Sequence, residues 1–79
     1  MLTVAVLKRN GCVVSSDAPV TVAIGEPFQI YRMNGATQLI VGTGTVHKLM
    51  GPTQFKLHPQ QRGPFPGVLV GDLVQAVVR

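Results

Sequence analysis

Short segments in which apolar and polar side chains alternate recur along the chain. The clearest is the stretch in which Val20, Val22 and Ile24 alternate with Thr21 and Ala23. A period of two predicts a strand with one buried face, whereas spacings of three and four residues would predict a helix. The same pattern, together with the many β-branched residues, predicts strands at residues 2–7, 12–16, 20–24, 28–33, 37–49, 55–58, 68–70 and 73–79.

Turn-forming residues separate these segments at short intervals. Asn10-Gly11 and Asn34-Gly35 predict tight hairpins, because a type I′ turn needs positive φ at both central residues and favours this dipeptide. Gly25-Glu26-Pro27, Gly51-Pro52 and Gly71-Asp72 mark further corners. Six or seven short strands joined in this way, with no segment of helical period, predict an all-β fold that is either a small barrel or a sandwich.

Two segments repeat the same order of residue types. Residues 24–30 (IGEPFQI) and 70–76 (VGDLVQA) each read branched aliphatic, Gly, acid, any residue, apolar, Gln, apolar. We expect Gly25 and Gly71 to turn the chain, and the carboxylates of Glu26 and Asp72 to accept backbone N–H groups left free where a strand bends. These four residues would then form structural corners of a barrel. The alternative is a chance repetition, since the motif arises readily in β-rich sequences.

The Gly71-Asp72 corner before the last strand resembles the "GD box" of cradle-loop and RIFT-type barrels, among them the second domain of translational GTPases. With residues 20–32 and 42–46, it is also similar to the C-terminal barrel of the flagellar assembly protein T family, in which a V-G-x-x-F-x-V-Y-R … G-T-x-x-V … G-D-x-V pattern recurs. The resemblance implies a barrel of six to seven strands, RIFT-like or SH3-like, without substantial helix. It also implies a non-catalytic attachment or binding module, and it carries over no functional residue.

Composition narrows the class of protein further. The 79 residues form a single predicted domain, residues 1–79, with a formal net charge of +4 but only 13% charged residues, against about 25% in a typical soluble domain. An apolar content of 46% excludes intrinsic disorder, and the lone Cys12 excludes an intrachain disulfide scaffold. Residues 1–7 make a poor signal peptide and no apolar run is long enough to span a membrane, so we expect a cytoplasmic or virion-associated protein.

Few residues are suited to catalysis or metal binding. The chain has three side-chain carboxylates, all in predicted turns where capping is their simplest role: Asp17, Glu26 and Asp72. Cys12 opens an apolar strand and, with His47 and His58, lacks the close ligand pairing of structural zinc sites. Gly42-Thr43-Gly44 lacks the third glycine of a dinucleotide-binding loop. We therefore predict no catalytic residue, cofactor or metal, with an active site shared between subunits as the open alternative.

The basic residues suggest another class of function. Lys48 and Lys56 flank the Gly51-Pro52 turn and His58 follows closely, so this hairpin is a candidate contact for nucleic acid or an acidic partner. Against this, single-strand binders use exposed aromatic platforms, and the chain has three Phe, one Tyr and no Trp. The net positive charge also reflects a scarcity of acids more than an abundance of bases.

Residues 58–67 (HPQQRGPFPG) form a Pro- and Gly-rich arm that fits neither a central strand nor a helix. Prolines hold such a segment extended and so reduce the entropy lost when it docks. Phe65, between Pro64 and Pro66, is a candidate apolar anchor on a neighbouring subunit, and Arg62 is a candidate ion-pair partner. The alternative is a loop exposed to solvent.

These observations favour a non-enzymatic structural or adaptor barrel that self-associates within a larger assembly, such as a virion or a secretion or motility machine. A domain this short gains little net stability from its own core, and contacts with further copies or other subunits would supply the rest. Its low content of charged residues also favours association over a monomeric state. The alternative is a small basic nucleic-acid-binding barrel of SH3-like or OB-like type. We expect no insertion into membranes.

Overall fold

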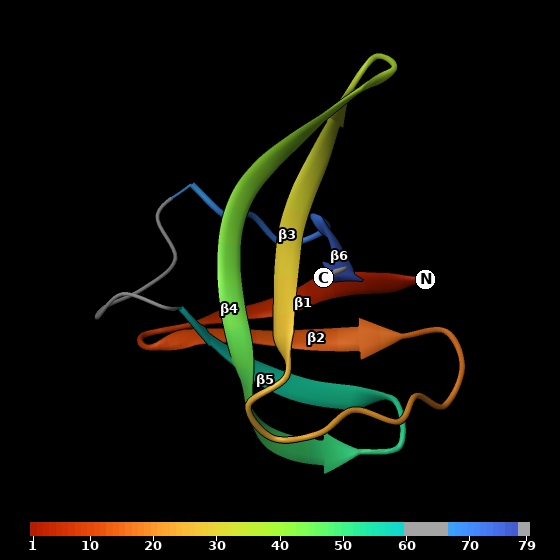
Figure 1. Ribbon diagram of the computed structural model, residues 1–79, viewed down its shortest axis with the longest axis vertical. Helices are drawn as coiled ribbons and strands as arrows, with labels where there is room; N and C mark the ends of the chain where they lie inside the picture. The colour runs from red at the N-terminus through yellow and green to blue at the C-terminus, as the bar shows by residue number, and fades with distance from the viewer. Residues whose placement is uncertain (60–66, 78–79) are drawn as a thin grey trace.

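Six antiparallel strands close into a barrel in the computed structural model, which describes residues 1–59 and 67–77 (Figure 1). The strands are β1 (Leu2–Lys8), β2 (Gly11–Ser16), β3 (Pro27–Asn34), β4 (Thr37–Gly51), β5 (Gln54–Pro59) and β6 (Leu73–Ala76). Their order around the barrel is β1-β2-β5-β4-β3-β6, and β6 pairs with β1 to complete the circle. This arrangement confirms the all-β barrel and excludes the sandwich.

The barrel interior is filled by one apolar cluster to which every strand contributes. Phe28 of β3 and Phe55 of β5 pack with their ring centroids 5.2 Å apart, and Ile30 and Leu57 are fully buried. The other buried members of the cluster are Val4, Cys12, Val14, Val46, Val68 and Val74. Successive side chains of a strand point to opposite faces, so these inward residues alternate with outward ones. In the described parts of the chain no helix is long and apolar enough to cross a membrane.

Two of the predicted strands are irregular in the structure. Residues 20–24 lie outside the sheet and contact the β4–β5 turn through a bond from the Val20 N–H to the Pro52 carbonyl (2.9 Å). Val20 and Val22 pack against the core, so the alternation in the sequence reflects one-sided packing without ladder pairing. Residues 68–70 are also irregular and lead into a turn. Both strand predictions were therefore wrong.

The first hairpin turns one residue earlier than predicted. Lys8 pairs with Gly11, so Arg9 and Asn10 are the central residues of the turn, and none of these has a positive φ. The type I′ prediction is therefore wrong here. Gly11 is needed for a different reason, because a Cβ at this position would collide with the backbone carbonyl oxygen of Leu57. The glycine thus lets β2 and β5 approach closely.

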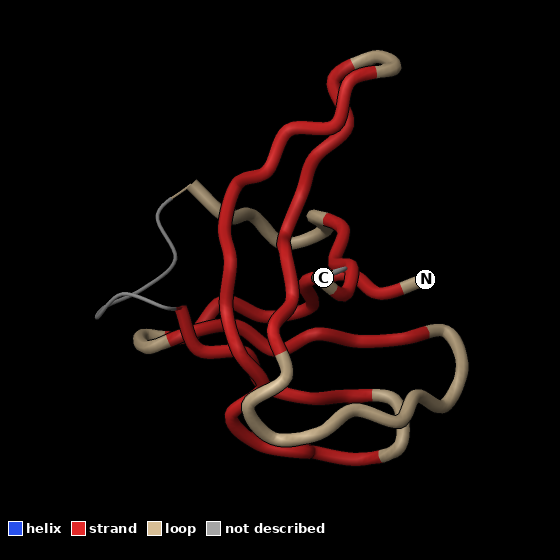
Figure 2. Tube along the Cα trace, in the orientation of Figure 1, coloured by secondary structure: helices blue, strands red, loops and turns tan. Residues whose placement is uncertain are grey.

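The second hairpin turns one residue later than predicted, at Gly35 and Ala36, because Asn34 pairs with Thr37. Only Gly35 has a positive φ (62°), as in a type II′ turn rather than the predicted type I′ turn. β6 pairs with β3 only at residues 28–31. The second half of β3 and the facing part of β4 extend beyond the barrel at one end of its long axis (Figures 1 and 2).

Four β-bulges, each with one extra residue, interrupt the ladders: Ala5 in β1, and Val41, His47 and Met50 in β4. A bulge bends its strand and increases the local twist, which helps a short sheet to close. It also breaks the strict alternation of faces. In β4, the inward-facing Val46 is therefore followed by two outward-facing residues, His47 and Lys48, both of which have partners on the outer face of β5.

The two Gly-acid corners have the same local structure. In residues 23–26 and in residues 69–72, the N–H of the acid donates to the carbonyl of the residue three positions earlier (3.0 and 3.1 Å). Gly25 and Gly71 have φ values of 89° and 96°. This is the geometry of a type II turn, in which glycine is favoured at the third position because φ is positive there. The sequence repeat therefore corresponds to a structural repeat.

Each corner is bonded to the other half of the chain. Residues 25–26 exchange two backbone hydrogen bonds with Val46 of β4 (2.8 and 3.0 Å), and residues 71–72 exchange the same two bonds with Val4 of β1 (2.8 Å each). Gln29 of β3 pairs directly with Gln75 of β6. The barrel therefore has an approximate twofold axis near this pair, which exchanges β1 with β4, β2 with β5 and β3 with β6.

Candidate functional site

The arm that the sequence singles out lies mostly outside the described residues. Arg62, Pro64, Phe65 and Pro66 all fall there, so the docking arm stays a prediction. Among the described residues, side chains that could bind a partner or ligand lie on three other parts of the barrel. These are the outer face of β4 and β5, the junction beneath the β3–β4 hairpin, and the two ends of the long axis.

Lys48 and Lys56 lie directly opposite each other on the outer face of the β4–β5 ladder. The Cβ atoms of such a cross-strand pair are about 5 Å apart, and like charges at this spacing repel. The ion pairs in the described part of the chain lie elsewhere, so neither lysine has a carboxylate partner there. This pairing places two lysines next to each other on the outer face, where a bound anion would relieve their repulsion.

Two stacked imidazoles lie beside the lysine pair. The rings of His47 and His58 are 3.7 Å apart between centroids and within 12° of parallel. Gly11 leaves room for the His58 ring, since a Cβ at Gly11 would lie 3.1 Å from its Cδ2 atom. Nε2 of His58 is buried and has no hydrogen-bond partner among the described residues. Burial, followed by the charges of His47 and Lys56, lowers the pKa of His58, which favours its neutral form.

A cross-strand row connects the lysine pair to an apolar pair. Val6 pairs with Val13, Val13 with Lys56, and Lys56 with Lys48, from β1 through β2 and β5 to β4. The approximate twofold axis relates the two halves of this row, because one bulge precedes Val6 and the equivalent bulge precedes Lys48. The half formed by Val6 and Val13 is apolar and the half formed by Lys56 and Lys48 is basic, although the two halves have similar backbone structure.

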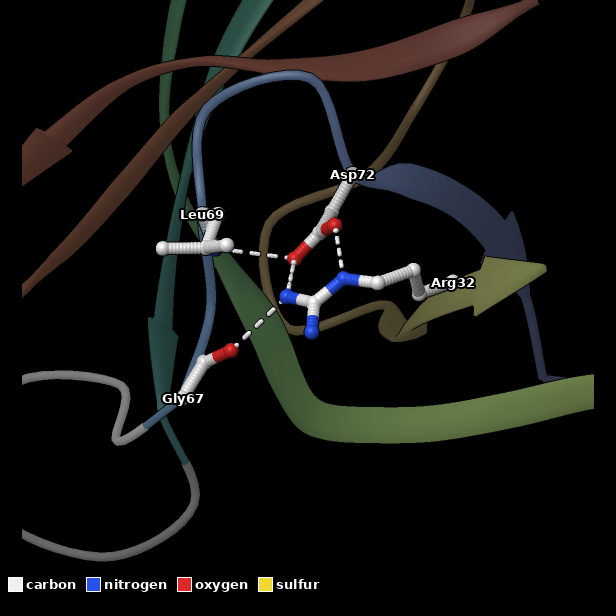
Figure 3. A network of polar contacts seen from close by, with 4 residues as sticks. All are labelled: Arg32, Gly67, Leu69 and Asp72. Carbon is white, nitrogen blue, oxygen red and sulfur yellow. Dashed lines mark hydrogen bonds and ion pairs between the residues drawn. The ribbon is translucent and has the colours of Figure 1, made fainter. Parts of the chain in front are cut away.

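A polar network joins the base of the β3–β4 hairpin to the turn that enters β6 (Figure 3). Arg32 donates from Nε to Oδ1 of Asp72 (2.8 Å) and from Nη2 to Oδ2 (2.7 Å), and Nη2 also donates to the Gly67 carbonyl (2.9 Å). The Leu69 N–H donates to Oδ2 of Asp72 (2.8 Å). The hydrogen bonds from Arg32, helped by that from Leu69 and opposed by burial, lower the pKa of Asp72. Asp72 is 6% exposed and ionised, and it holds the hairpin against the corner.

The equivalent acid in the other corner makes fewer contacts. Oε1 of Glu26 accepts one hydrogen bond of 3.3 Å from the Ala23 N–H at the surface. No ion pair of Glu26 is present among the described residues. The two corners thus share a backbone, whereas Asp72 alone binds an arginine from a neighbouring strand.

Cys12 faces the core, on the opposite side of the sheet from the stacked imidazoles. It is fully buried, and burial raises the pKa of its thiol to about 12. The thiolate is the form that acts as nucleophile or metal ligand, so Cys12 is inert in this state. No group of three His, Cys, Asp or Glu side chains is arranged to hold a metal ion in the part of the chain described.

Many large apolar side chains are exposed on this small barrel. Within residues 1–59 and 67–77, those exposed by 42% or more are Met1, Val6, Leu7, Ile24, Met33, Leu39, Ile40, Leu49, Met50, Leu69 and Val70. Met33, Leu39 and Ile40 lie on the protruding β3–β4 hairpin, while Leu49 and Met50 lie near the other end of β4. A single exposed apolar residue is ordinary, but a group of them marks an interaction surface.

A small pocket adjoins Leu49. It has a volume of about 160 Å³ and lies between residues 20–22 and the adjoining ends of β4 and β5. Its lining residues are Val20, Thr21, Val22, Leu49, Gly51, Gln54 and Phe55, none of which is charged. β4 begins in the protruding hairpin and ends at Leu49 and Gly51, which line this pocket. The chain trace shows the two ends of this strand at opposite ends of the long axis (Figure 2).

Sequence reasoning grouped Lys48, Lys56 and His58, but it missed the stacking of His47 and the apolar ends of the barrel. The position of His47 on the outer face depends on a β-bulge, and the local sequence does not identify a bulge reliably. Leu39 and Leu49 fit the alternating pattern whether they face inward or outward.

Comparisons with protein-family models, with curated proteins and with solved structures found no match to this chain. Its function is therefore inferred from the residues of the barrel themselves.

Proposed function

We propose that this chain is a non-enzymatic structural or adaptor barrel that associates with further copies of itself within a larger assembly. The observation that carries the proposal is the exposure, among the described residues, of eleven large apolar side chains outside a closed core. Grouped apolar side chains on the surface of a small protein mark places that another molecule covers. A virion or a secretion or motility machine is the kind of assembly that would contain such a subunit.

The surface of the barrel is large enough for more than one contact. The single chain exposes 4982 Å², and a standard interface covers about 800 Å² on each partner. One contact would therefore cover about a sixth of the surface, and two contacts about a third. Partners that bind only the folded chain also stabilise it, which matters for a barrel of 79 residues.

Three titratable groups of types that serve in catalysis are engaged within the fold. Asp72 and Glu26 accept backbone N–H groups of turns, and Cys12 is buried with a raised pKa. Carboxylates and thiols are among the groups that acid–base and nucleophilic catalysis use. Their roles in turns and core favour a structural subunit over an enzyme.

Static light scattering of the purified chain, over a range of concentrations in chloride and in sulfate, tests this proposal. Sulfate is excluded from protein surfaces and so strengthens the burial of apolar area. We expect a mass above the 8.4 kDa of one chain, rising with concentration and rising further in sulfate. A mass of 8.4 kDa at every concentration in both salts would overturn the proposal.

The lysine pair supports a second candidate function, the binding of single-stranded nucleic acid through its phosphates. Lys48 and Lys56 lie opposite each other without a carboxylate partner in the described residues, which favours a bound anion. Fluorescence anisotropy with a labelled oligonucleotide should show binding that weakens steeply between about 50 and 200 mM salt. Lys48→Gln and Lys56→Gln should each weaken it, with Lys8→Gln as the control. Absent binding, or equal effects of all three substitutions, would exclude this candidate.

A further inference from the structure

Uncharged residues make up most of the β3–β4 hairpin and the lining of the pocket, although the chain as a whole carries +4. Residues 33–46, which include most of the protruding hairpin, contain no Asp, Glu, Lys or Arg, and Arg32 at its base is paired with Asp72. The residues that line the pocket beside Leu49 are also uncharged. Two copies that met through their basic faces would bring like charges together, whereas contact between these two ends avoids that repulsion.

The β3–β4 hairpin offers apolar side chains on both of its faces. Met33 and Leu39 are 48% and 44% exposed, and Ile40 is 48% exposed. Leu39 is paired with Arg32, and Met33 belongs to the next pair toward the tip. Because neighbouring residues of a strand point to opposite faces, Leu39 lies on one face of the hairpin and Met33 on the other. The hairpin is only two strands wide here, so both are accessible at a narrow projection.

The pocket has the size of one such side chain. Its volume is about 160 Å³, and an apolar cavity of about 150 Å³ admits a benzene-sized group. Val20, Val22 and the fully buried Phe55 are among its lining residues, together with Leu49, which is 51% exposed. An aliphatic side chain inserted here would cover Leu49 and fill the space beside the core.

We infer that the protruding part of the β3–β4 hairpin of one copy docks, through the exposed side chain of Leu39, into the pocket beside Leu49 of the next copy. This inference rests on the proposed self-association and names its interface. The two surfaces differ and lie at the two ends of β4, which Figure 1 shows at opposite ends of the long axis. The contact is therefore head-to-tail, and repeated copies build a ring or a filament rather than a closed dimer.

Complementation between two defective variants tests this geometry. Leu39→Lys places a charge on the hairpin, and Leu49→Lys places one at the pocket; both side chains are exposed, so the core is unchanged. Each variant alone should associate about tenfold more weakly than the native chain, or more weakly still. An equimolar mixture should recover one contact, between the intact hairpin of one variant and the intact pocket of the other. Its mass should rise to twice 8.4 kDa and no further, because both remaining ends are defective.

Leu7→Lys is the matched control, since Leu7 is 42% exposed but lies at the end of β1, away from both surfaces. Sedimentation velocity measures the masses, and circular dichroism confirms that each variant is folded. If a variant is unfolded, Leu39→Ser replaces Leu39→Lys and Gln54→Arg replaces Leu49→Lys.

The outcomes separate this inference from the proposed function. If the native chain stays a monomer, both fail together. If the native chain associates but Leu39→Lys and Leu49→Lys associate as Leu7→Lys does, only the head-to-tail contact is overturned. It is also overturned if the two variants are monomers and their mixture recovers nothing, which would indicate a symmetric contact or a different partner for these surfaces.

Discussion

Replacement of Asp72 by alanine removes the acceptor at the centre of the network beneath the β3–β4 hairpin. Three hydrogen bonds are lost, two from Arg32 at 2.8 and 2.7 Å and one from the Leu69 N–H at 2.8 Å. The side chain of Arg32 is 40% exposed, so water can bind its guanidinium in place of the lost carboxylate. The N–H of Leu69 makes a part-buried hydrogen bond, and the methyl group of alanine offers it no acceptor.

The expected loss of stability follows from that backbone donor. A buried N–H left without an acceptor costs about 1–3 kcal/mol. The unsatisfied N–H of Leu69 accounts for the expected loss, and the rehydrated guanidinium adds nothing to it. The free energy of unfolding should therefore fall by about 2 kcal/mol. In a domain of this length, about 1 kcal/mol shifts the Tm by about 4–8 °C, so the Tm of Asp72→Ala should fall by about 10 °C.

Urea unfolding followed by circular dichroism measures this difference. Both proteins must be compared at one concentration, because association shifts apparent stability. Glu26→Ala is the matched control, since Glu26 occupies the equivalent corner but accepts a single bond of 3.3 Å. We expect it to cost less than about 0.5 kcal/mol. Equal losses at the two corners would refute the reasoning, as would a negligible loss at Asp72.

The effect of Asp72 should also depend on pH. Its folded pKa lies below the ordinary value of 3.8, so the native state binds fewer protons at this group than the unfolded state does. The stabilisation is therefore present above pH 3.8 and is lost as the pH falls through the lowered pKa. The difference between the native chain and Asp72→Ala should narrow in acid, and a difference that stays constant there would contradict this assignment.

Three further predictions test other parts of the barrel. Gly11→Ala should destabilise it by about 3 kcal/mol in urea unfolding, because its Cβ would collide with the Leu57 carbonyl; Gly51→Ala, which meets nothing within 4 Å, should be close to neutral. Cys12 should resist a thiol reagent in the native state and react only on unfolding, since burial raises its pKa to about 12; rapid labelling of the folded chain would contradict this placement. The lowered pKa of His58 means that the unfolded state takes up a proton more readily, so stability should fall as the pH drops below 6.5. His58→Gln should reduce that slope, and an unchanged slope would show that another group causes it.

The strands themselves could be predicted from the sequence, because a strand with one buried face imposes a period of two. Whether an alternating segment joins a sheet depends on its pairing partners, which the local pattern does not reveal. Residues 20–24 alternate cleanly, yet they cross beside the β4–β5 turn without a ladder partner. The turns at residues 9–10 and 35–36 were also displaced by one residue, because strand register fixes where each turn falls.

The repeated Gly-acid corners were visible in the sequence, since both glycines need positive φ. The partner of Asp72 was not, because Arg32 lies 40 positions away and only the barrel brings them together. The lysine pair could be anticipated from the short hairpin between Lys48 and Lys56. The exposure of Leu39 could not, because an extension beyond the barrel carries the same alternation as a strand within it.

Sedimentation equilibrium of the native chain, from micromolar to millimolar concentration, tests self-association most directly. The account predicts a weight-average mass that exceeds 8.4 kDa and increases continuously with concentration, as open head-to-tail growth requires, or that reaches the plateau of a closed ring. A folded chain that stays at 8.4 kDa up to millimolar concentration would contradict it, since the exposed apolar ends would then have no copy to cover them.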